Sequence, residues 1–307
     1  MSIAFVFPGQ GSQSVGMIAG LAARPQVRAT FDEASAVLGQ DLWHLVAQGP
    51  EAQLNLTINT QPAMLAAGIA TYRTYRAAGG IAPAMVAGHS LGEYTALVVA
   101  GSLTFSDAIA LVRFRAEAMQ SAVPEGVGAM AAILGLDDDA VRAVCRDAAQ
   151  GEVVEAVNLN SPGQVVIAGH RSAVDRALTL AKERHAKRVI HLPVSVPSHS
   201  SLMKPAADRL AAYLAQVEVI APTIPVLCNA DVEVNVDPEK IRDALVRQLI
   251  LPVRWVETIR ELRNRGATRL IECGPGKVLA GLSKRIDNTL PSLAIVDEVS
   301  LEAAKQG

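Results

Sequence analysis

The segment Gly88-His89-Ser90-Leu91-Gly92 places a serine between two glycines, and it constrains the fold of this chain more than any other stretch. Small and apolar residues precede it from Met85, and apolar residues at helical spacing follow it through Val98. A Gly-x-Ser-x-Gly pattern in this setting is typical of a sharp turn between a strand and a helix, where a Cβ beside the serine would clash. We therefore predict that Ser90 stands above a sheet edge as a nucleophile. A serine that only caps the helix is the alternative.

The predicted turn also determines what surrounds the serine hydroxyl. Ser90 would lie at a helix N-terminus, where free N–H groups and the positive end of the helix dipole stabilise an anion forming on a bound carbonyl. The N–H of Leu91 is the expected donor. His89 is a poor base because neighbouring side chains diverge on such a turn. His199 lies in a loop rich in proline and serine and is a better acid–base candidate than the other histidines.

Short apolar runs predict a parallel sheet. Residues 3–7 form one such run, and residues 224–228 and 269–272 form others that return the chain to the same sheet. Helical patterns lie between the first two of these runs. Together with the strand, turn and helix around Ser90, they predict an α/β fold whose large domain is α/β-hydrolase-like, with a parallel central sheet.

A second pattern interrupts the first. Strand-like and helix-like stretches follow one another as β-α-β-β-α-β over residues 128–192, which predicts an inserted ferredoxin-like small subdomain. Segments rich in proline or glycine flank it at residues 123–126 and 193–197. The expected parts are a large α/β-hydrolase-like domain over residues 1–123 and 197–307 and a ferredoxin-like subdomain over residues 124–196.

Charge and cysteine content exclude several functional classes. The chain of 307 residues carries 28 Lys and Arg against 30 Asp and Glu, so it lacks the basic excess of a nucleic-acid-binding protein. Its three cysteines form no Cys-x-x-Cys pair and its histidines no metal-ligand spacing, so we expect no metal and a reducing compartment. No apolar run reaches the roughly 18 residues of a membrane span, and no basic region precedes the first apolar run as in a signal peptide. A cytoplasmic protein without a membrane partner is expected.

A glycine-rich loop follows the first predicted strand. The loop Gly9–Gln13 lacks the third glycine of a dinucleotide-binding motif, because Ser14 stands at that position. Ligands of open α/β sheets bind at the ends of such strands. Backbone N–H groups of this loop and the amide of Gln10 can therefore face a cleft at the sheet edge.

Three further polar residues lie on or beside predicted helices. Gln61 precedes Pro62, which predicts the first turn of a helix over residues 63–77, with Gln61 at its mouth. Arg113 and Arg115 are two positions apart on another predicted helix and so point to different faces. One of these arginines can face inward, although a solvated surface charge is the commoner role.

Three segments, Phe7–Gln13, Gly88–Tyr94 and Pro197–Ser201, occur in the order and at the separations of one protein family. Through them the chain resembles the malonyl-CoA:acyl carrier protein transacylases of type II fatty acid synthesis. Each segment alone is moderately specific, and jointly they are highly specific. The resemblance extends over nearly the whole chain, and the other segments that carry it are Thr60–Leu65, Val123–Gly126, Val157–Gly163 and Glu272–Lys277.

The resemblance implies a ping-pong acyl transfer. Ser90 would be the nucleophile and His199 its general base, with the histidine oriented by the backbone carbonyl of Gln248 instead of a carboxylate. The acyl-serine would pass malonyl from malonyl-CoA to the phosphopantetheine thiol of acyl carrier protein, for fatty acid elongation. No cofactor is expected, since malonyl-CoA is a substrate. We also expect a monomer.

The resemblance also assigns residues that hold the substrate. Gln10 and Leu91 would supply the backbone donors of the oxyanion hole. Arg115 would pair with the free carboxylate of malonyl, because a charge that leaves water needs a fixed partner and a guanidinium fork matches a carboxylate. Gln61 and Asn160 would line the path of the acyl group and the pantetheine arm.

Three alternatives remain open. A trans-acting polyketide acyltransferase would share the same site. A serine esterase or thioesterase would use water as the acceptor and place an acid between Ser90 and His199 in chain order, as Asp147 and Asp175 are placed. A non-catalytic acyl-binding protein would not need Ser90 and His199 together.

Two basic clusters are candidates for docking an acidic carrier protein. An ordinary solvated face is an equal alternative for each cluster. The clusters consist of Lys182, Arg184, Lys187 and Arg188, and of Arg260, Arg263 and Arg265.

Overall fold

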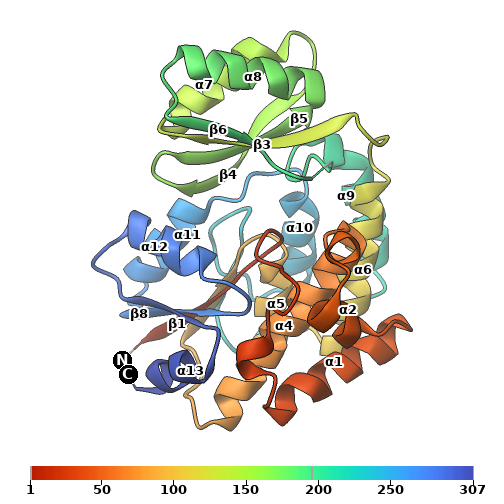
Figure 1. The fold of residues 1–307 in the computed structure, drawn as a ribbon, viewed down its shortest axis with the longest axis vertical. Coiled ribbons are helices and arrows are strands. Elements are labelled where there is room, and N and C mark those ends of the chain that lie inside the picture. The colour runs from red at the N-terminus through yellow and green to blue at the C-terminus, as the bar shows by residue number, and fades with distance from the viewer. Residues whose placement is uncertain (1, 195, 307) are drawn as a thin grey trace.

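The computed structural model describes residues 2–194 and 196–306 and contains two sheets (Figure 1). The strands of the first sheet are β1 (Ile3–Phe7), β2 (Met85–Gly88), β7 (Val226–Leu227), β8 (Arg269–Cys273) and β9 (Ser292–Ile295). The strands of the second sheet are β3 (Gly128–Leu134), β4 (Val154–Ser161), β5 (Gln164–His170) and β6 (Arg188–His191). The helices are α1 (Pro25–Leu38), α2 (Leu42–Gln48), α3 (Glu51–Leu54), α4 (Thr57–Ala77), α5 (Gly92–Val99), α6 (Phe105–Gln120), α7 (Asp138–Ala149), α8 (Arg171–Glu183), α9 (Lys204–Leu214), α10 (Pro238–Gln248), α11 (Trp255–Asn264), α12 (Val278–Ile286) and α13 (Glu298–Lys305), with short 3-10 turns at Ala19–Leu21 and Ser201–Met203.

The first sheet is parallel throughout, in the order β7-β2-β1-β8-β9. Its central strands are almost wholly apolar and buried, as parallel strands covered on both faces must be. The predicted α/β fold with a parallel central sheet is confirmed. Phe7 of β1 is paired with Gly88 of β2, so the loops that follow these two strands leave the sheet side by side.

Helices cover both faces of this sheet. Alternation along β1 sends Phe5 and Phe7 into a large core shared with α1, α4, α5, α6 and α9. The same alternation sends Ala4 and Val6 to the opposite face, where they pack with Trp255 and other apolar residues of α11 and α12. The sheet is thereby packed between two layers of helices.

The second sheet is antiparallel, in the order β4-β5-β3-β6, and its helices and strands follow the predicted β-α-β-β-α-β order. Helices α7 and α8 pack on the face that Figure 1 shows turned away from the first sheet. Strand β4 joins the two parts. The N–H of Leu159 donates to the carbonyl of Val253 at 3.0 Å, and the N–H of Val253 donates to the carbonyl of Val157 at 2.9 Å.

The predicted start of one helix is wrong. The sequence predicts Pro62 in the first turn of a helix from Ala63, whereas α4 begins at Thr57 and contains Pro62 in its interior. The carbonyl of Ile58 therefore lacks its usual helical N–H partner. Most residues of α4 are buried, and this packing outweighs the local cost of the proline. Gln61 lies within the helix and not at its mouth.

Helices α3, α10, α11 and α13 are not predicted from the sequence. Helix α13 lies in the polar tail, and its cap explains its start. The carboxylate of Asp297 accepts the N–H of Ser300 at 2.8 Å, while the hydroxyl of Ser300 accepts the N–H of Asp297 at 3.0 Å. This reciprocal cap satisfies two of the free donors at a helix N-terminus, so the short segment can be helical without a strong apolar pattern.

Within residues 2–194 and 196–306, no helix combines the length and the apolar content that crossing a bilayer requires. In the same part of the chain, no group of three or more His, Cys, Asp or Glu side chains is arranged to hold a metal ion. Cys145, Cys228 and Cys273 are buried free thiols.

Candidate active site at the β2–α5 turn

The predicted sharp turn joins β2 to α5. Ser90 has a φ of +52°, a left-handed conformation that residues other than glycine rarely adopt. The flanking glycines are required by close backbone contacts. A Cβ at Gly88 would lie 1.8 Å from the carbonyl carbon of Gly92, and a Cβ at Gly92 would lie 2.0 Å from the carbonyl oxygen of Phe7. The turn is therefore pressed against the end of β1.

Gly92→Ala is expected to lower the melting temperature by about 3–10 °C, because an overpacked backbone contact typically costs about 1–3 kcal/mol. The measurement is thermal unfolding followed by circular dichroism. Gly281→Ala in α12 is the matched control, since a Cβ at this exposed position meets no atom within 4 Å. Equal melting temperatures for the two variants would contradict the close contact at Gly92.

Ser90 and His199 are brought into direct contact from segments far apart in the sequence. The hydroxyl of Ser90 lies 2.7 Å from Nε2 of His199, and Nδ1 of His199 lies 2.7 Å from the backbone carbonyl of Gln248 at the end of α10. A carbonyl can only accept, so Nδ1 carries the proton and Nε2 accepts from the serine hydroxyl. This is the arrangement that a general base needs.

The surroundings of His199 keep its imidazole neutral. The side chain is only 3% exposed, and burial lowers the pKa of His199 to about 3, with the nearby positive charge of Arg115 acting in the same direction. Nε2 is therefore free to accept a proton at neutral pH. Among the residues that the structure describes, no carboxylate pairs with this ring, and the Gln248 carbonyl occupies Nδ1.

Arg115 points inward from α6, whereas Arg113 does not enter the site. Arg115 is 1% exposed; its Nη1 donates to Gln61 at 2.9 Å, and its Nη2 donates to Gln248 at 3.0 Å and to the hydroxyl of Ser90 at 3.3 Å. Within the described part of the chain, no carboxylate lies within 4.0 Å of its guanidinium, and Nε has no hydrogen-bond partner. A buried cation of this kind has unused capacity for an anion beside the serine.

The remaining predicted residues surround this centre. Oδ1 of Asn160 on β4 accepts a hydrogen bond from Nε2 of His89 at 2.8 Å. Gly9, which precedes Gln10, lies against the turn between β2 and α5. A Cβ at Gly9 would be 2.5 Å from the carbonyl oxygen of His89. Among the described residues, no hydrogen bond uses the N–H of Leu91. That N–H is available to a ligand.

Two buried residues that the sequence analysis does not single out also belong to this site. The side chain of Asn229 accepts the N–H of Ser90 at 2.6 Å and donates to the carbonyl of Gly88 at 2.5 Å. Glu93, in the first turn of α5, accepts the N–H of Asn229 at 3.0 Å. Each carries a sequence signal: Asn229 follows a buried strand near its carboxyl end, and Glu93 is a charge on an otherwise apolar helix.

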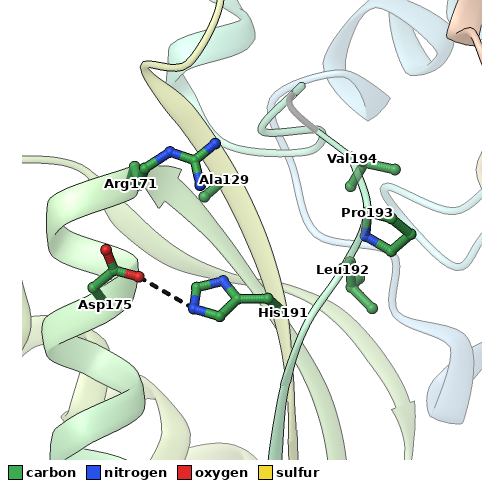
Figure 2. Close-up of a pocket in the computed structure, with 7 residues that line it drawn as sticks. All are labelled: Ala129, Arg171, Asp175, His191, Leu192, Pro193 and Val194. Carbon is green, nitrogen blue, oxygen red and sulfur yellow. Dashed lines mark ion pairs between the residues drawn. The ribbon is translucent and has the colours of Figure 1, made fainter.

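The aspartates considered for an esterase triad lie elsewhere. Asp175 pairs with His191 at 3.2 Å, and Asp147 pairs with Arg184, all within the second sheet and its helices. Figure 2 shows the first of these pairs at a cavity of about 460 Å³. None of the residues assigned to the acyl-transfer site lines this cavity, whose lining consists of Ala129, Arg171, Asp175, His191, Leu192, Pro193 and Val194.

In both basic clusters, some arginines form ion pairs with acidic residues of this chain. Arg184 pairs with Asp147, Arg265 pairs with Glu261 at 2.7 Å, and Arg263 lies 4.0 Å from Asp287. Paired surface charges attract an acidic partner less than free ones do. Docking at either cluster stays a prediction.

Known proteins are similar to this chain in sequence. A family model described as an acyl transferase domain matches residues 4–300. The chain is 57% identical to the malonyl CoA-acyl carrier protein transacylase of Escherichia coli K12 over 302 residues, which cover 98% of each chain. It is 46% identical to the protein of the same name from Bacillus subtilis over 306 residues, which cover 99% of this chain and 96% of the relative.

Solved structures agree with these matches. The acyl-carrier-protein S-malonyltransferase of Burkholderia pseudomallei has 60% sequence identity and a TM-score of 0.98, with 100% of each chain covered. A malonyl transacylase solved in complex with a type II polyketide acyl carrier protein has 55% identity and a TM-score of 0.98, with 100% of this chain and 99% of that chain covered.

Proposed function

Because the chain belongs to the acyl transferase family, we propose that it is a malonyl-CoA:acyl carrier protein malonyltransferase that supplies malonyl units for fatty acid elongation. The relatives named above support the donor and the acceptor. The observation that carries the proposal is Arg115, a buried guanidinium without a carboxylate partner that lies 3.3 Å from the hydroxyl of Ser90. Malonyl carries a free carboxylate close to its thioester carbon, so one pocket can hold both groups.

In the first half of the reaction, His199 removes the proton of the Ser90 hydroxyl as the oxygen attacks the thioester carbon of malonyl-CoA. The carbonyl π bond opens to give an oxyanion. When it re-forms, the carbon–sulfur bond breaks and His199 returns the proton to the CoA thiolate. The product is a malonyl ester of Ser90 with free CoA.

The second half reverses these roles. The phosphopantetheine thiol of acyl carrier protein gives its proton to His199 and attacks the ester carbon. The Ser90 oxygen leaves and takes the proton back, which yields malonyl-carrier protein and free enzyme. The neutral imidazole of His199 suits both steps, since it must accept a proton before it can donate one.

The oxyanion would be held by the backbone N–H groups of Leu91 and Gln10. The N–H of Ser90 cannot take this role, because it already donates to Asn229 at 2.6 Å. Gln61 would hold Arg115 in place from one side. Asn160, beside His89 at the end of β4, would line the path of the pantetheine arm.

We propose a finer division of the fold as well. The large domain would be α/β-hydrolase-like over residues 1–123 and 197–307, and the subdomain over residues 124–196 would be ferredoxin-like, which its β4-β5-β3-β6 strand order supports. We further propose a cytoplasmic monomer that needs no cofactor, since the described chemistry uses only side chains, backbone and the two substrates.

A second candidate acceptor comes from one comparison. The relative solved with a type II polyketide acyl carrier protein suggests that a polyketide carrier protein could take the malonyl group here as well. The geometry around Ser90 does not separate the two acceptors. A hydrolase triad places an acid behind its histidine, whereas Nδ1 of His199 meets the carbonyl of Gln248 here.

The test of the proposal follows malonyl to its acceptor. The protein is incubated with malonyl-CoA and then with buffer, with holo acyl carrier protein from fatty acid synthesis, or with a polyketide carrier protein. We expect malonyl-carrier protein as the main product and little free malonate. Rapid release of free malonate without carrier protein would favour the thioesterase alternative.

A pH profile tests the state of His199. The rate of Ser90 acylation by malonyl-CoA is expected to change less than about twofold between about pH 5 and about pH 8, because a base with a pKa of about 3 stays neutral there. An ordinary histidine would lose activity below its pKa of 6.5. Rapid-quench measurement of acyl-enzyme checks this, and a tenfold fall per pH unit below 6.5 would contradict it.

The same profile needs a folding control. Between the lowered pKa of about 3 and the ordinary value of 6.5, the unfolded chain binds a proton at His199 that the folded chain does not. This group therefore contributes less stability as the pH falls through that interval. Circular dichroism at each pH separates loss of fold from protonation of the base.

A further inference from the structure

Glu93 is a buried carboxylate that the mechanism above does not use. It is 1% exposed and is the charged residue of α5, three positions after Ser90. One of its oxygens, Oε2, accepts the side-chain N–H of Gln248 at 2.7 Å and the backbone N–H of Asn229 at 3.0 Å. Burial has the largest effect and raises the pKa of Glu93 above its ordinary value, although these hydrogen bonds and the charge of Arg115 act in the opposite direction. A carboxylate is costly to bury, so its placement calls for a reason.

The orientation of the Gln248 amide gives that reason. Its nitrogen faces acceptors only: Glu93 at 2.7 Å and the carbonyl of Ser90 at 3.1 Å. Its oxygen therefore faces Nη2 of Arg115, at 3.0 Å. The opposite orientation would bring the amide nitrogen against the guanidinium, with a donor facing a donor. Oε2 of Glu93 is an acceptor here, because the backbone N–H of Asn229 can only donate to it, so Glu93 selects the orientation that presents the amide oxygen to Arg115.

Glu93 is linked to Arg115 through Gln248 and so does not block the site. Arg115 is reached through the Gln248 amide and not by the carboxylate itself, so the guanidinium keeps room for a second carboxylate. A direct ion pair at this position would occupy the fork that a substrate needs. The same carboxylate fixes Asn229, whose side chain spans the N–H of Ser90 and the carbonyl of Gly88.

We propose that Glu93 is a positioning residue for selection of the acyl group: through the Gln248 amide it holds the Arg115 guanidinium ready for a carboxylate on the acyl chain. The inference rests on the proposed function, since it concerns how the same site recognises malonyl. Glu93 does not touch the substrate. Its effect should therefore appear in the choice between acyl groups that carry a carboxylate and those that do not.

The test compares malonyl-CoA with acetyl-CoA in single-turnover acylation of Ser90. In Glu93→Gln, the ratio of the malonyl rate to the acetyl rate is expected to fall roughly tenfold to hundredfold, the range for weakening one hydrogen bond to a charged group. The Gln side chain keeps the shape of Glu93 but can also donate, so it no longer selects the amide orientation. Glu117→Gln, at an exposed position of α6, is the matched control and should leave the ratio unchanged. A purely structural role for Glu93 would slow both acyl groups alike.

A double mutant tests the route through Gln248. Gln248→Met removes the amide but keeps the backbone carbonyl that bonds His199. It should lower the ratio by itself, and adding Glu93→Gln should lower it no further, because the two residues act through one contact. If Glu93→Gln does not fold, the ratio of the malonyl rate to the acetyl rate in Gln248→Met tests the inference. A lowered ratio supports it, and an unchanged ratio overturns it.

An unchanged ratio in Glu93→Gln or in Gln248→Met, or fully additive losses in the double mutant, would overturn the inference. These results are distinguishable from failure of the proposed function. A wild-type protein that takes up no malonyl would remove the proposed function and this inference together, whereas a selective wild type with unchanged variants would remove only the inference.

Discussion

Ser90→Ala is expected to reduce malonyl transfer to acyl carrier protein by roughly 10⁴-fold or more, since removing a nucleophile that acts as a unit with its base leaves only binding and oxyanion stabilisation. The hydroxyl of Ser90 is the group that His199 contacts at 2.7 Å, and alanine leaves that imidazole without a partner to activate. The measurement is the initial rate of malonyl-carrier protein formation. The fold should be retained, because alanine fits wherever the serine backbone fits.

Ser121→Ala is the matched control, since Ser121 is an exposed serine at the end of α6. Its hydroxyl donates to backbone carbonyls of the last turn of α6 and accepts from Arg209. It should transfer malonyl at the wild-type rate. If Ser90→Ala retained more than a few per cent of wild-type activity, another group would have to carry the acyl chain, and the assignment of Ser90 would fail.

Arg115→Ala is expected to lower kcat/KM for malonyl-CoA by roughly 10²–10³-fold, because the malonyl carboxylate would then leave water without a charged partner. Acetyl-CoA has no such carboxylate, so its kcat/KM should fall far less. The relevant quantity is the ratio of the two specificity constants. It isolates recognition of the carboxylate from any general damage to the site.

Arg113→Ala provides the control for this variant. Arg113 lies on the same helix, two positions earlier. It points away from Ser90 and donates to the side chain of Gln40 at 2.6 Å. Its removal should leave the ratio of malonyl to acetyl unchanged. Equal losses for both donors in Arg115→Ala would show that the arginine supports the fold of the site and does not read the carboxylate.

The sequence predicts the turn at Ser90 and the parallel sheet because both have local signatures. Two glycines without room for a Cβ and short apolar runs are visible without tertiary information. The contact between Ser90 and His199 is different: it joins residues 109 positions apart and was expected only through the family resemblance. Periodicity alone places His199 in a loop and says nothing of its partner.

The parts that the sequence does not predict depend on burial. Helix α4 contains Pro62 because packing of nearly the entire helix outweighs one missing hydrogen bond. Glu93 and Asn229 are polar residues whose roles depend on which groups meet across the core, namely the end of β7, the start of α5 and the end of α10. Such a network is formed by tertiary contacts, so local propensity does not indicate it.

The central claim is that Ser90 carries the malonyl group as an ester between two thiols. The most direct measurement is mass spectrometry of the protein after mixing with malonyl-CoA, with the modified peptide identified before and after addition of holo acyl carrier protein. We predict one malonyl group on the peptide that contains Ser90, lost at the rate at which malonyl-carrier protein appears. Formation of malonyl-carrier protein at the full rate with Ser90 unmodified, or with the label on another residue, would contradict the account.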